Sequence, residues 1–239
     1  MIEHHLMKLR ARDEIGEEEE EAVRGTVAEI IEIPADRHLV RAYEPVETSN
    51  VLISGIACRY KDLRDGSRQI TELHVAGDYA DLHSFTLKYL DHDVLALTDC
   101  RFAVVPHERL REVTQQFPHL TRIYWFSTNL DAAVHREWEV SLGRRSAQAA
   151  LAHLFCEMEV RLGIVGLAAD GKYRLPITQT DLAECLGLTS VHVNRTLQEL
   201  RASGLLEFRG GEVTIPDLAR LRTVAEFDPG YLYLDKRPR

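Results

Sequence analysis

The sequence predicts an α+β protein with three parts, in chain order a double-stranded β-roll, a long helix and a winged helix-turn-helix. Short runs of branched residues separated by turn residues occupy 28–106, and a long helical pattern covers 120–142. Two short helical patterns joined at a glycine and followed by Gly210-Gly211 occupy 175–215. We expect domain boundaries that give three segments: 1–116, 117–143 and 144–239.

The composition predicts a cytoplasmic protein. Its 45% hydrophobic content is ordinary for a globular chain, and the longest apolar stretch, 147–156, is too short to span a bilayer and contains His153. The N-terminus has no apolar core of the signal-peptide kind. Four scattered cysteines without a CxxC pair indicate reduced thiols, and the strand positions of two of them predict buried, inert groups. The four are Cys58, Cys100, Cys156 and Cys185.

The net charge of -9 is unevenly distributed. Residues 144–239 hold 13 Lys and Arg against 12 Asp and Glu, so the acidity lies in residues 1–143. A near-neutral domain still binds nucleic acid if its basic residues face the phosphates. Charge alone therefore neither predicts nor excludes a nucleic-acid partner.

The N-terminal part begins with one expected helix, 13–27, whose glutamate run is best explained as a solvated face. Asp65-Gly66 lies between two strand-like runs and predicts a hairpin. Apolar residues alternate over 94–105, which we expect to be one strand. In the long helix, four apolar residues recur at heptad-like spacing, a pattern typical of a helix–helix seam. They are Leu120, Ile123, Leu130 and Val134.

The segment 175–215 has the pattern of a winged helix-turn-helix. Thr178 is placed to cap a helix, with Asp181 three residues later as in a capping box. Gly187 permits a sharp turn, and Thr189 caps the second helix. The second helix turns its larger apolar residues inward. Four residues remain on its outer face: Ser190, Val191, Asn194 and Arg195.

These outer residues have the chemistry that reads base edges. Arginine bonds guanine in two places, asparagine bonds adenine, and valine contacts the methyl group of thymine. A helix-turn-helix presents this half of its second helix to the major groove. A plain helical hairpin packed against protein is the alternative for the two helices alone, and Gly210-Gly211 directly after them favours a DNA-binding domain.

The turn Gly187-Leu188-Thr189 and the step Arg195-Thr196-Leu197 resemble the DNA-binding domain of the Crp/Fnr superfamily. The likeness covers nearly the whole chain, including Gly77-Asp78 after a strand of the roll. It implies a homodimeric, sequence-specific transcription regulator on a palindromic operator in double-stranded DNA. It also implies a cyclic-nucleotide-binding-like roll, a dimerisation helix at 119–143 with the four apolar residues named above as its seam, and RNA polymerase as a partner.

The same resemblance implies residue roles. Ser190, Val191 and Arg195 take base-reading positions, and Val191 replaces the glutamate of many members, which predicts a different operator. Five further residues take phosphate-facing positions: Thr178, Gln179, Thr180, Thr189 and His192.

Cyclic AMP is not the expected effector. The family's nucleotide sensors hold the ribose with a Gly-Glu pair and the phosphate with an Arg-Ser pair, whereas Asp81-Leu82 follows the glycine turn here. Residues 69–100 contain no arginine, and Asp91 and Asp93 would repel a phosphate; Lys88 is the one possible substitute. An unidentified small-molecule or redox effector, or none, stays open.

The alternative class is a cupin-like metal-binding protein or enzyme with an appended helical domain. A cupin site needs a His-x-His pair, and His74, His83 and His92 do not form one. Iron–sulfur clusters need clustered thiolates, which are absent from the sequence, and nothing indicates haem. We expect no metal, no cofactor and no enzymatic activity. A third class, an adaptor that uses the winged domain for protein contacts, would show no salt-dependent DNA affinity.

Overall fold

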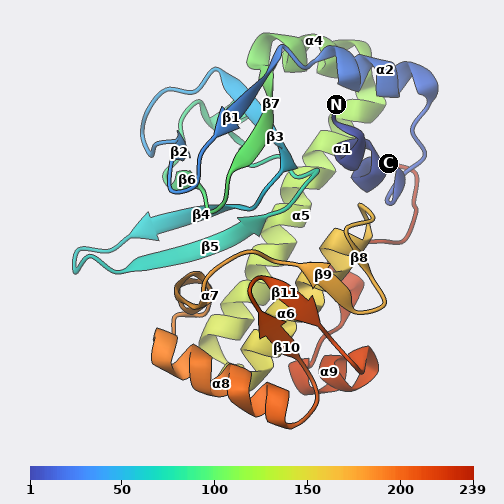
Figure 1. Cartoon of the computed structure of the whole chain (residues 1–239). Helices are drawn as coiled ribbons and strands as arrows, with labels where there is room; N and C mark the ends of the chain where they lie inside the picture. The colour runs from blue at the N-terminus through green and yellow to red at the C-terminus, as the bar shows by residue number, and fades with distance from the viewer. The chain divides into compact units, whose positions relative to one another are not determined.

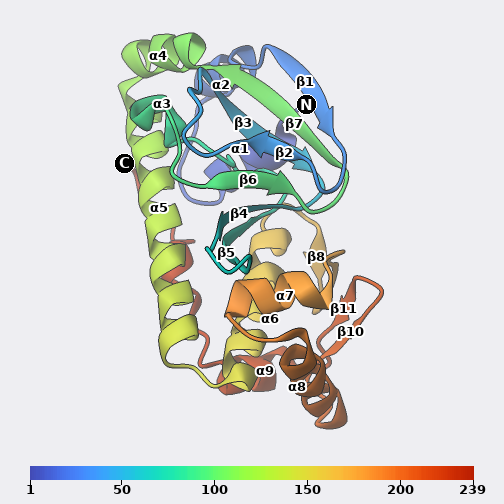
Figure 2. The ribbon, with the colours of Figure 1, turned by 90° about the vertical axis from the view of Figure 1, so that its left-hand side faces the viewer.

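The computed structural model describes all 239 residues and divides them into two compact units (Figures 1 and 2). The N-terminal unit comprises 1–60, 73–132 and 233–239, and the C-terminal unit comprises 61–72 and 133–232. The tip of one β-hairpin is therefore grouped with the C-terminal unit, and the last seven residues with the N-terminal unit.

Seven strands form two antiparallel sheets, in the orders β1-β7-β3 and β2-β6-β4-β5, which make the predicted β-roll. Buried apolar side chains, Leu52, Leu90 and Phe102 among them, fill its interior. The strands are β1 (Glu29–Ile33), β2 (His38–Val40), β3 (Thr48–Ser54), β4 (Ala57–Asp62), β5 (Arg68–His74), β6 (Asp93–Ala96) and β7 (Cys100–Pro106).

The single strand expected over 94–105 is wrong, because the chain changes sheets in its middle. β6 pairs with β2 and β4, whereas β7 pairs with β1 and β3. The crossing at residues 97–99 is fixed by side chains: Thr98 Oγ1 accepts a hydrogen bond from the Ile56 amide at 2.9 Å, and Asp99 Oδ1 accepts one from the Ala35 amide at 3.0 Å. Alternation holds on each side of the crossing, so the break leaves no trace in the pattern.

The N-terminal unit contains two helices that the sequence pattern missed, α1 (Glu3–Arg10) and the short α3 (Ser84–Leu87). Helix α1 packs Leu6 and Leu9 into the same core as α5, and a Cβ on Gly77 would lie 2.6 Å from the His4 carbonyl oxygen. The acidic helix is shorter than expected, at Glu17–Gly25. The helices are α1, α2 (Glu17–Gly25), α3 (Ser84–Leu87), α4 (His107–Gln116) and α5 (Pro118–Gly143), which continues into the C-terminal unit.

Much of α5 is already covered within the chain. Leu120 and Ile123 are buried in the core that α1 and the roll share, and Val134 is buried as well. Leu130 is half-buried. The helix expected at 120–142 is confirmed, but burial makes three of its four proposed seam residues unavailable to a partner.

The C-terminal unit contains α6 (Ala147–Gly163), which Ser146 caps by accepting a hydrogen bond from the Ala149 amide at 3.2 Å. The fully buried Glu157 on α6 accepts hydrogen bonds from Trp138, Arg161 and Tyr231, which ties α5 and the C-terminal segment to α6. The other elements are β8 (Ala168–Ala169), β9 (Lys172–Arg174), α7 (Gln179–Leu186), α8 (Ser190–Ala202), β10 (Glu207–Arg209), β11 (Glu212–Thr214), α9 (Leu218–Ala225) and the 3-10 helix η1 (Pro229–Leu232). No helix has both the length and the apolar character that a bilayer span requires.

Candidate DNA-binding surface

The first helix of the predicted motif begins as the sequence indicates. Thr178 Oγ1 accepts a hydrogen bond from the Asp181 amide at 3.1 Å, and the Asp181 carboxylate accepts one from the Thr178 amide at 2.6 Å. This reciprocal pair is the capping box, and it satisfies two amides that have no partner inside the helix. Gly187 ends the helix in the left-handed region at φ 61°, where a side chain would be strained.

The second helix, α8, has one buried and one open side. Thr189 Oγ1 accepts from the His192 amide at 3.2 Å and caps it. Val193, Leu197 and Leu200 are buried against the unit. Ser190, Val191, Asn194 and Arg195 are all exposed, so the open side is the one that the pattern predicted.

Val191 and Arg195 both extend far into solvent on this side. Val191 is 80% exposed, which is unusual for an aliphatic residue, and the Arg195 side chain is 67% exposed. Four residues apart on a helix, they lie on one face. The guanidinium of Arg195 is 3.9 Å from the Glu199 carboxylate, an exposed pair that holds it weakly.

Asn194 differs because both ends of its amide are occupied. Its Nδ2 donates to Gln179 Oε1 at 3.0 Å, and its Oδ1 accepts from Gln198 Nε2 at 2.8 Å. The side chain thus bridges α7 and α8. Sequence reasoning missed Gln198, whose only signal was its spacing of four from Asn194. Ser190 also meets α7, with its hydroxyl 3.5 Å from that of Thr180.

The residues predicted to face phosphates lie at the starts of the two helices. Thr178, Gln179, Thr180 and Thr189 are exposed, and His192 is half-buried. Backbone amides at a helix start favour anions, so both starts can receive phosphate oxygens.

The wing follows directly. β10 and β11 form a hairpin through Gly210 and Gly211, both with positive φ, in a sheet ordered β10-β11-β9-β8. A Cβ on Gly211 would lie 2.8 Å from the Cα of Pro176, so glycine is required where the wing approaches the start of the motif.

Matches to known proteins agree with this arrangement. The model of the Crp-like helix-turn-helix domain matches residues 149–224, and that of the cyclic nucleotide-binding domain matches 30–117. The nitrogen fixation regulation protein FixK of Bradyrhizobium diazoefficiens is 33% identical over 185 residues, which are 76% of each chain. This chain belongs to the Crp/Fnr family of transcription regulators.

Other relatives of this Crp/Fnr regulator fit the same assignment. The transcriptional activator protein FnrL of Cereibacter sphaeroides is 30% identical over 176 residues, 71% of this chain and 69% of that protein. The solved structure of FixK2 from Bradyrhizobium japonicum superposes with a TM-score of 0.76 at 27% identity, covering 83% of this chain and 97% of the other. The regulator binds DNA through its helix-turn-helix domain and is not an enzyme.

The roll contains a buried acidic group beside β3. Asp81 is fully buried and accepts hydrogen bonds from the Asn50 amide at 2.6 Å and from Asn50 Nδ2 at 2.7 Å. Burial raises the pKa of Asp81 to about 7, against the opposing effects of Asn50 and Arg59. Arg59 is also buried, donates to the Ala80 carbonyl at 2.9 Å, and pairs with Asp131 of α5 at 3.0 Å.

Proposed function

We propose that this regulator reads its operator with Val191 and Arg195, assisted by Ser190, while Thr178, Gln179, Thr180, Thr189 and His192 contact phosphates. The observation that carries the proposal is the open side of α8, where Val191 and Arg195 are strongly exposed one turn apart. Valine against a thymine methyl and arginine against guanine give a half-site containing T and G. Asn194 already uses both its amide nitrogen and its amide oxygen in hydrogen bonds. We therefore propose that it joins α7 to α8 and does not read a base.

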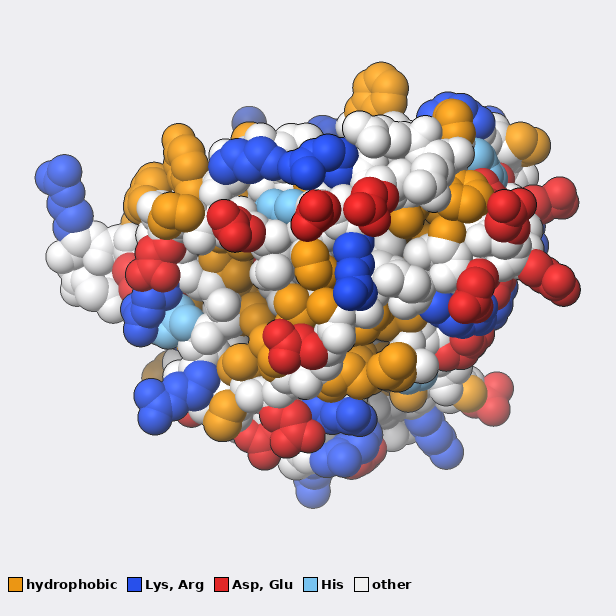
Figure 3. All heavy atoms as spheres, turned by 90° about the horizontal axis from the view of Figure 1, so that it is seen from above, with side chains coloured by type: hydrophobic (Ala, Val, Ile, Leu, Met, Phe, Trp, Pro, Cys, Tyr) orange, Lys and Arg blue, Asp and Glu red, His pale blue; other side chains and the backbone are white.

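The charge distribution leaves the C-terminal segment, which is near neutral, as the part of the chain that repels DNA least. The acidic excess lies in residues 1–143. Figure 3, seen from above, shows acidic and basic side chains interspersed, with no continuous basic field on that face.

Fluorescence anisotropy with random-sequence duplexes at increasing salt tests the proposal. We expect affinity to fall steeply with salt, because phosphate contacts release counterions. Affinity that does not change with salt would overturn it and favour a protein adaptor.

We also propose a homodimer formed along α5, with a seam that differs from the sequence-based one. Exposed residues recur on this helix at alternating spacings of three and four, which places them along one open face. Trp125 is 69% exposed in this stripe and is the large aromatic side chain that a second copy of the helix would cover. The stripe consists of Arg122, Trp125, Asn129, Ala132, Arg136 and Glu139.

A dimer of this kind assigns a separate function to each of three segments of the chain. We propose that 1–116 is the regulatory domain, 117–143 the dimerisation helix and 144–239 the DNA-binding domain. RNA polymerase is the proposed protein partner, since the similar FnrL is a transcriptional activator. Transcription of a template bearing the operator, with purified polymerase, tests this partner: an unchanged transcript level on adding the regulator would contradict it.

Cyclic AMP is not the proposed effector. The interior of the roll is filled by Leu52, Leu90 and Phe102, and the buried acidic group at Asp81 would face a phosphodiester unfavourably. Lys88 is exposed and its ammonium bonds the Phe85 carbonyl, so it does not point a charge into the interior. Calorimetric titration with cyclic AMP and cyclic GMP should show no binding. Micromolar affinity for either nucleotide with tighter operator binding would refute the proposal.

A further inference from the structure

We propose that Gln69, on the β4–β5 hairpin, is a positioning residue of the DNA-binding motif: its side-chain amide caps the end of α7. The inference rests on the proposed DNA-binding function. The hairpin tip, 61–72, is grouped with the helix-turn-helix in the C-terminal unit. Figures 1 and 2 both show β5 beside α7.

The contact supplies hydrogen bonds that a helix end lacks. The last four carbonyls of an α-helix have no donor within the helix. Near the end of α7, the Ala183 carbonyl is taken by the amides of Gly187 and Leu188. Gln69 Nε2 lies 2.7 Å from the Glu184 carbonyl oxygen and 3.2 Å from that of Cys185. The same Nε2 lies 2.9 Å from the Ile70 carbonyl oxygen, so this half-buried amide shares its two hydrogens between its own strand and the end of α7, where the Glu184 carbonyl is its nearest acceptor.

The amide also lies against the turn between the two helices. Gly187 follows α7, and a Cβ built on it would be 3.6 Å from Gln69 Oε1. Glu184 has its pKa raised by burial, and the nearby positive charge of Arg68 opposes that rise. Two successive hairpin residues thus interact with the end of α7: Gln69 donates hydrogen bonds to it, and Arg68 attracts the Glu184 carboxylate.

The hairpin is anchored, so it delivers Gln69 to a fixed place. Glu72, three residues later, is buried, and its carboxylate lies 3.2 Å from His135 Nε2 of α5 and 3.8 Å from Arg161 of α6. Arg161 in turn donates to the buried Glu157 at 2.9 Å. A strand fixed to both α5 and α6 restrains where α7 ends.

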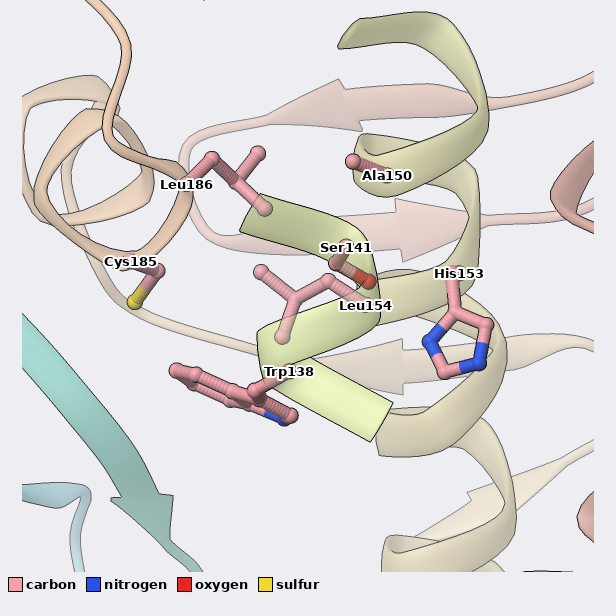
Figure 4. A pocket seen from close by; sticks show the side chains of 7 residues that line it. All are labelled: Trp138, Ser141, Ala150, His153, Leu154, Cys185 and Leu186. Atoms are coloured by element: carbon pink, nitrogen blue, oxygen red, sulfur yellow. The ribbon is translucent and has the colours of Figure 1, made fainter. Parts of the chain in front are cut away.

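The inner side of the same helix end is incompletely packed. Cys185 and Leu186 border a small pocket with residues of α5 and α6, shown in Figure 4. Its other lining residues are Trp138, Ser141, Ala150, His153 and Leu154.

The end of α7 sets the turn from which α8 starts. Without the cap, the angle between the helices would vary, and the phosphate-facing and base-reading residues would no longer meet DNA together. We therefore expect loss of Gln69 to weaken binding to all sequences alike, without a change in base preference.

Three variants test the donor requirement. Gln69→Glu keeps the shape, removes both donors and sets a carboxylate against two carbonyls. Gln69→Lys keeps a donor and places a positive charge at a helix C-terminus, where it is favourable. Leu63→Ala, at the exposed hairpin tip, is the matched control. We measure anisotropy with operator and random duplexes, and hydrogen exchange of residues 183–190 without DNA.

Gln69→Glu should bind both duplexes roughly tenfold more weakly and exchange faster over 183–190, consistent with the net strength of one or two hydrogen bonds. Gln69→Lys and the control should stay near the wild type. Wild-type affinity and exchange in Gln69→Glu, or a changed preference at one base pair, would overturn the inference. If the wild-type chain bound no DNA, the proposed function would fail, while the exchange comparison would still decide whether the cap exists.

Discussion

At the scale of single residues, the adjacent side chains of Asn194 and Arg195 on α8 differ in how strongly they are bound within the chain. Arg195 is exposed and paired only with Glu199, whereas Asn194 has both amide ends occupied. A weakly paired, exposed guanidinium can move into the groove at little cost, but an asparagine that reads a base must first give up two hydrogen bonds. The outer face was predictable from helical spacing; the bridge was not, because Gln179 lies on another helix.

Replacing Arg195 with alanine should cost about 1–3 kcal/mol of binding to the operator. Base preference should relax at one position in each half-site, because a bidentate contact to guanine is lost. The measurement is anisotropy with duplexes that carry single base-pair changes. Equal weakening on operator and random DNA would show that Arg195 contacts only phosphates.

Replacing Asn194 with alanine should instead weaken binding to all duplexes by a similar factor. Its effect should add only in part to that of Gln179→Ala, since both changes remove the hydrogen bond between α7 and α8, and Gln179→Ala also removes a proposed phosphate contact. The four proteins of this double-mutant cycle are compared on operator and random DNA. Loss of preference at one base pair in Asn194→Ala alone would make it a base reader.

At the scale of elements, the features that depend on neighbouring residues in the sequence were predicted well. The features that depend on contacts between distant residues were predicted poorly. The caps at Thr178 and Thr189 and the Gly210-Gly211 turn depend on residues within four positions, and all three are confirmed. The division of 94–105 between two sheets depends on Ile56 and Ala35, which are far away in sequence. Helix α1 forms because the roll and α5 give Leu6 and Leu9 a surface to cover, which its short sequence does not reveal.

The buried Asp81 carboxyl, which is hydrogen-bonded to Asn50 of β3, should make the stability of the fold depend on pH. The pKa of Asp81 is raised in the folded state to about 7, so the folded chain binds more protons than the unfolded one between about pH 4 and 7. Its contribution is thus fully present below pH 4 and is lost as pH rises through 7. About 4 kcal/mol is the most that this shift can supply.

The test compares urea unfolding of the wild type and Asp81→Asn between pH 5 and 8. The buried His5 and His153, whose pKa values burial lowers to about 4 and 3, act in the opposite direction, so the difference between the two proteins is the informative quantity. Relative to Asp81→Asn, the wild type should lose free energy of unfolding as pH rises. A constant difference would show that Asp81 does not titrate in this range.

At the scale of the whole molecule, the account requires two copies, because one recognition helix reads only one half-site. Trp125→Ala should weaken dimerisation by roughly 2 kcal/mol or more, the usual effect of truncating a central aromatic contact. Light scattering over a dilution series measures this. Tyr89→Ala, an exposed aromatic outside α5, is the control and should leave the dimer intact. A wild-type monomer at micromolar concentration that still binds DNA tightly would contradict the dimer.

The central claim is that two copies of α8 read a palindrome through Val191 and Arg195. Selection of binding sites from a pool of random duplexes by the purified wild-type protein tests it most directly. The account predicts an imperfect inverted repeat, with T and G in each half and half-site centres roughly one turn of DNA apart, a spacing already described for DNA-binding dimers that include a relative of this chain. Enrichment of a single unrepeated half-site, or no enrichment over the starting pool, would contradict it.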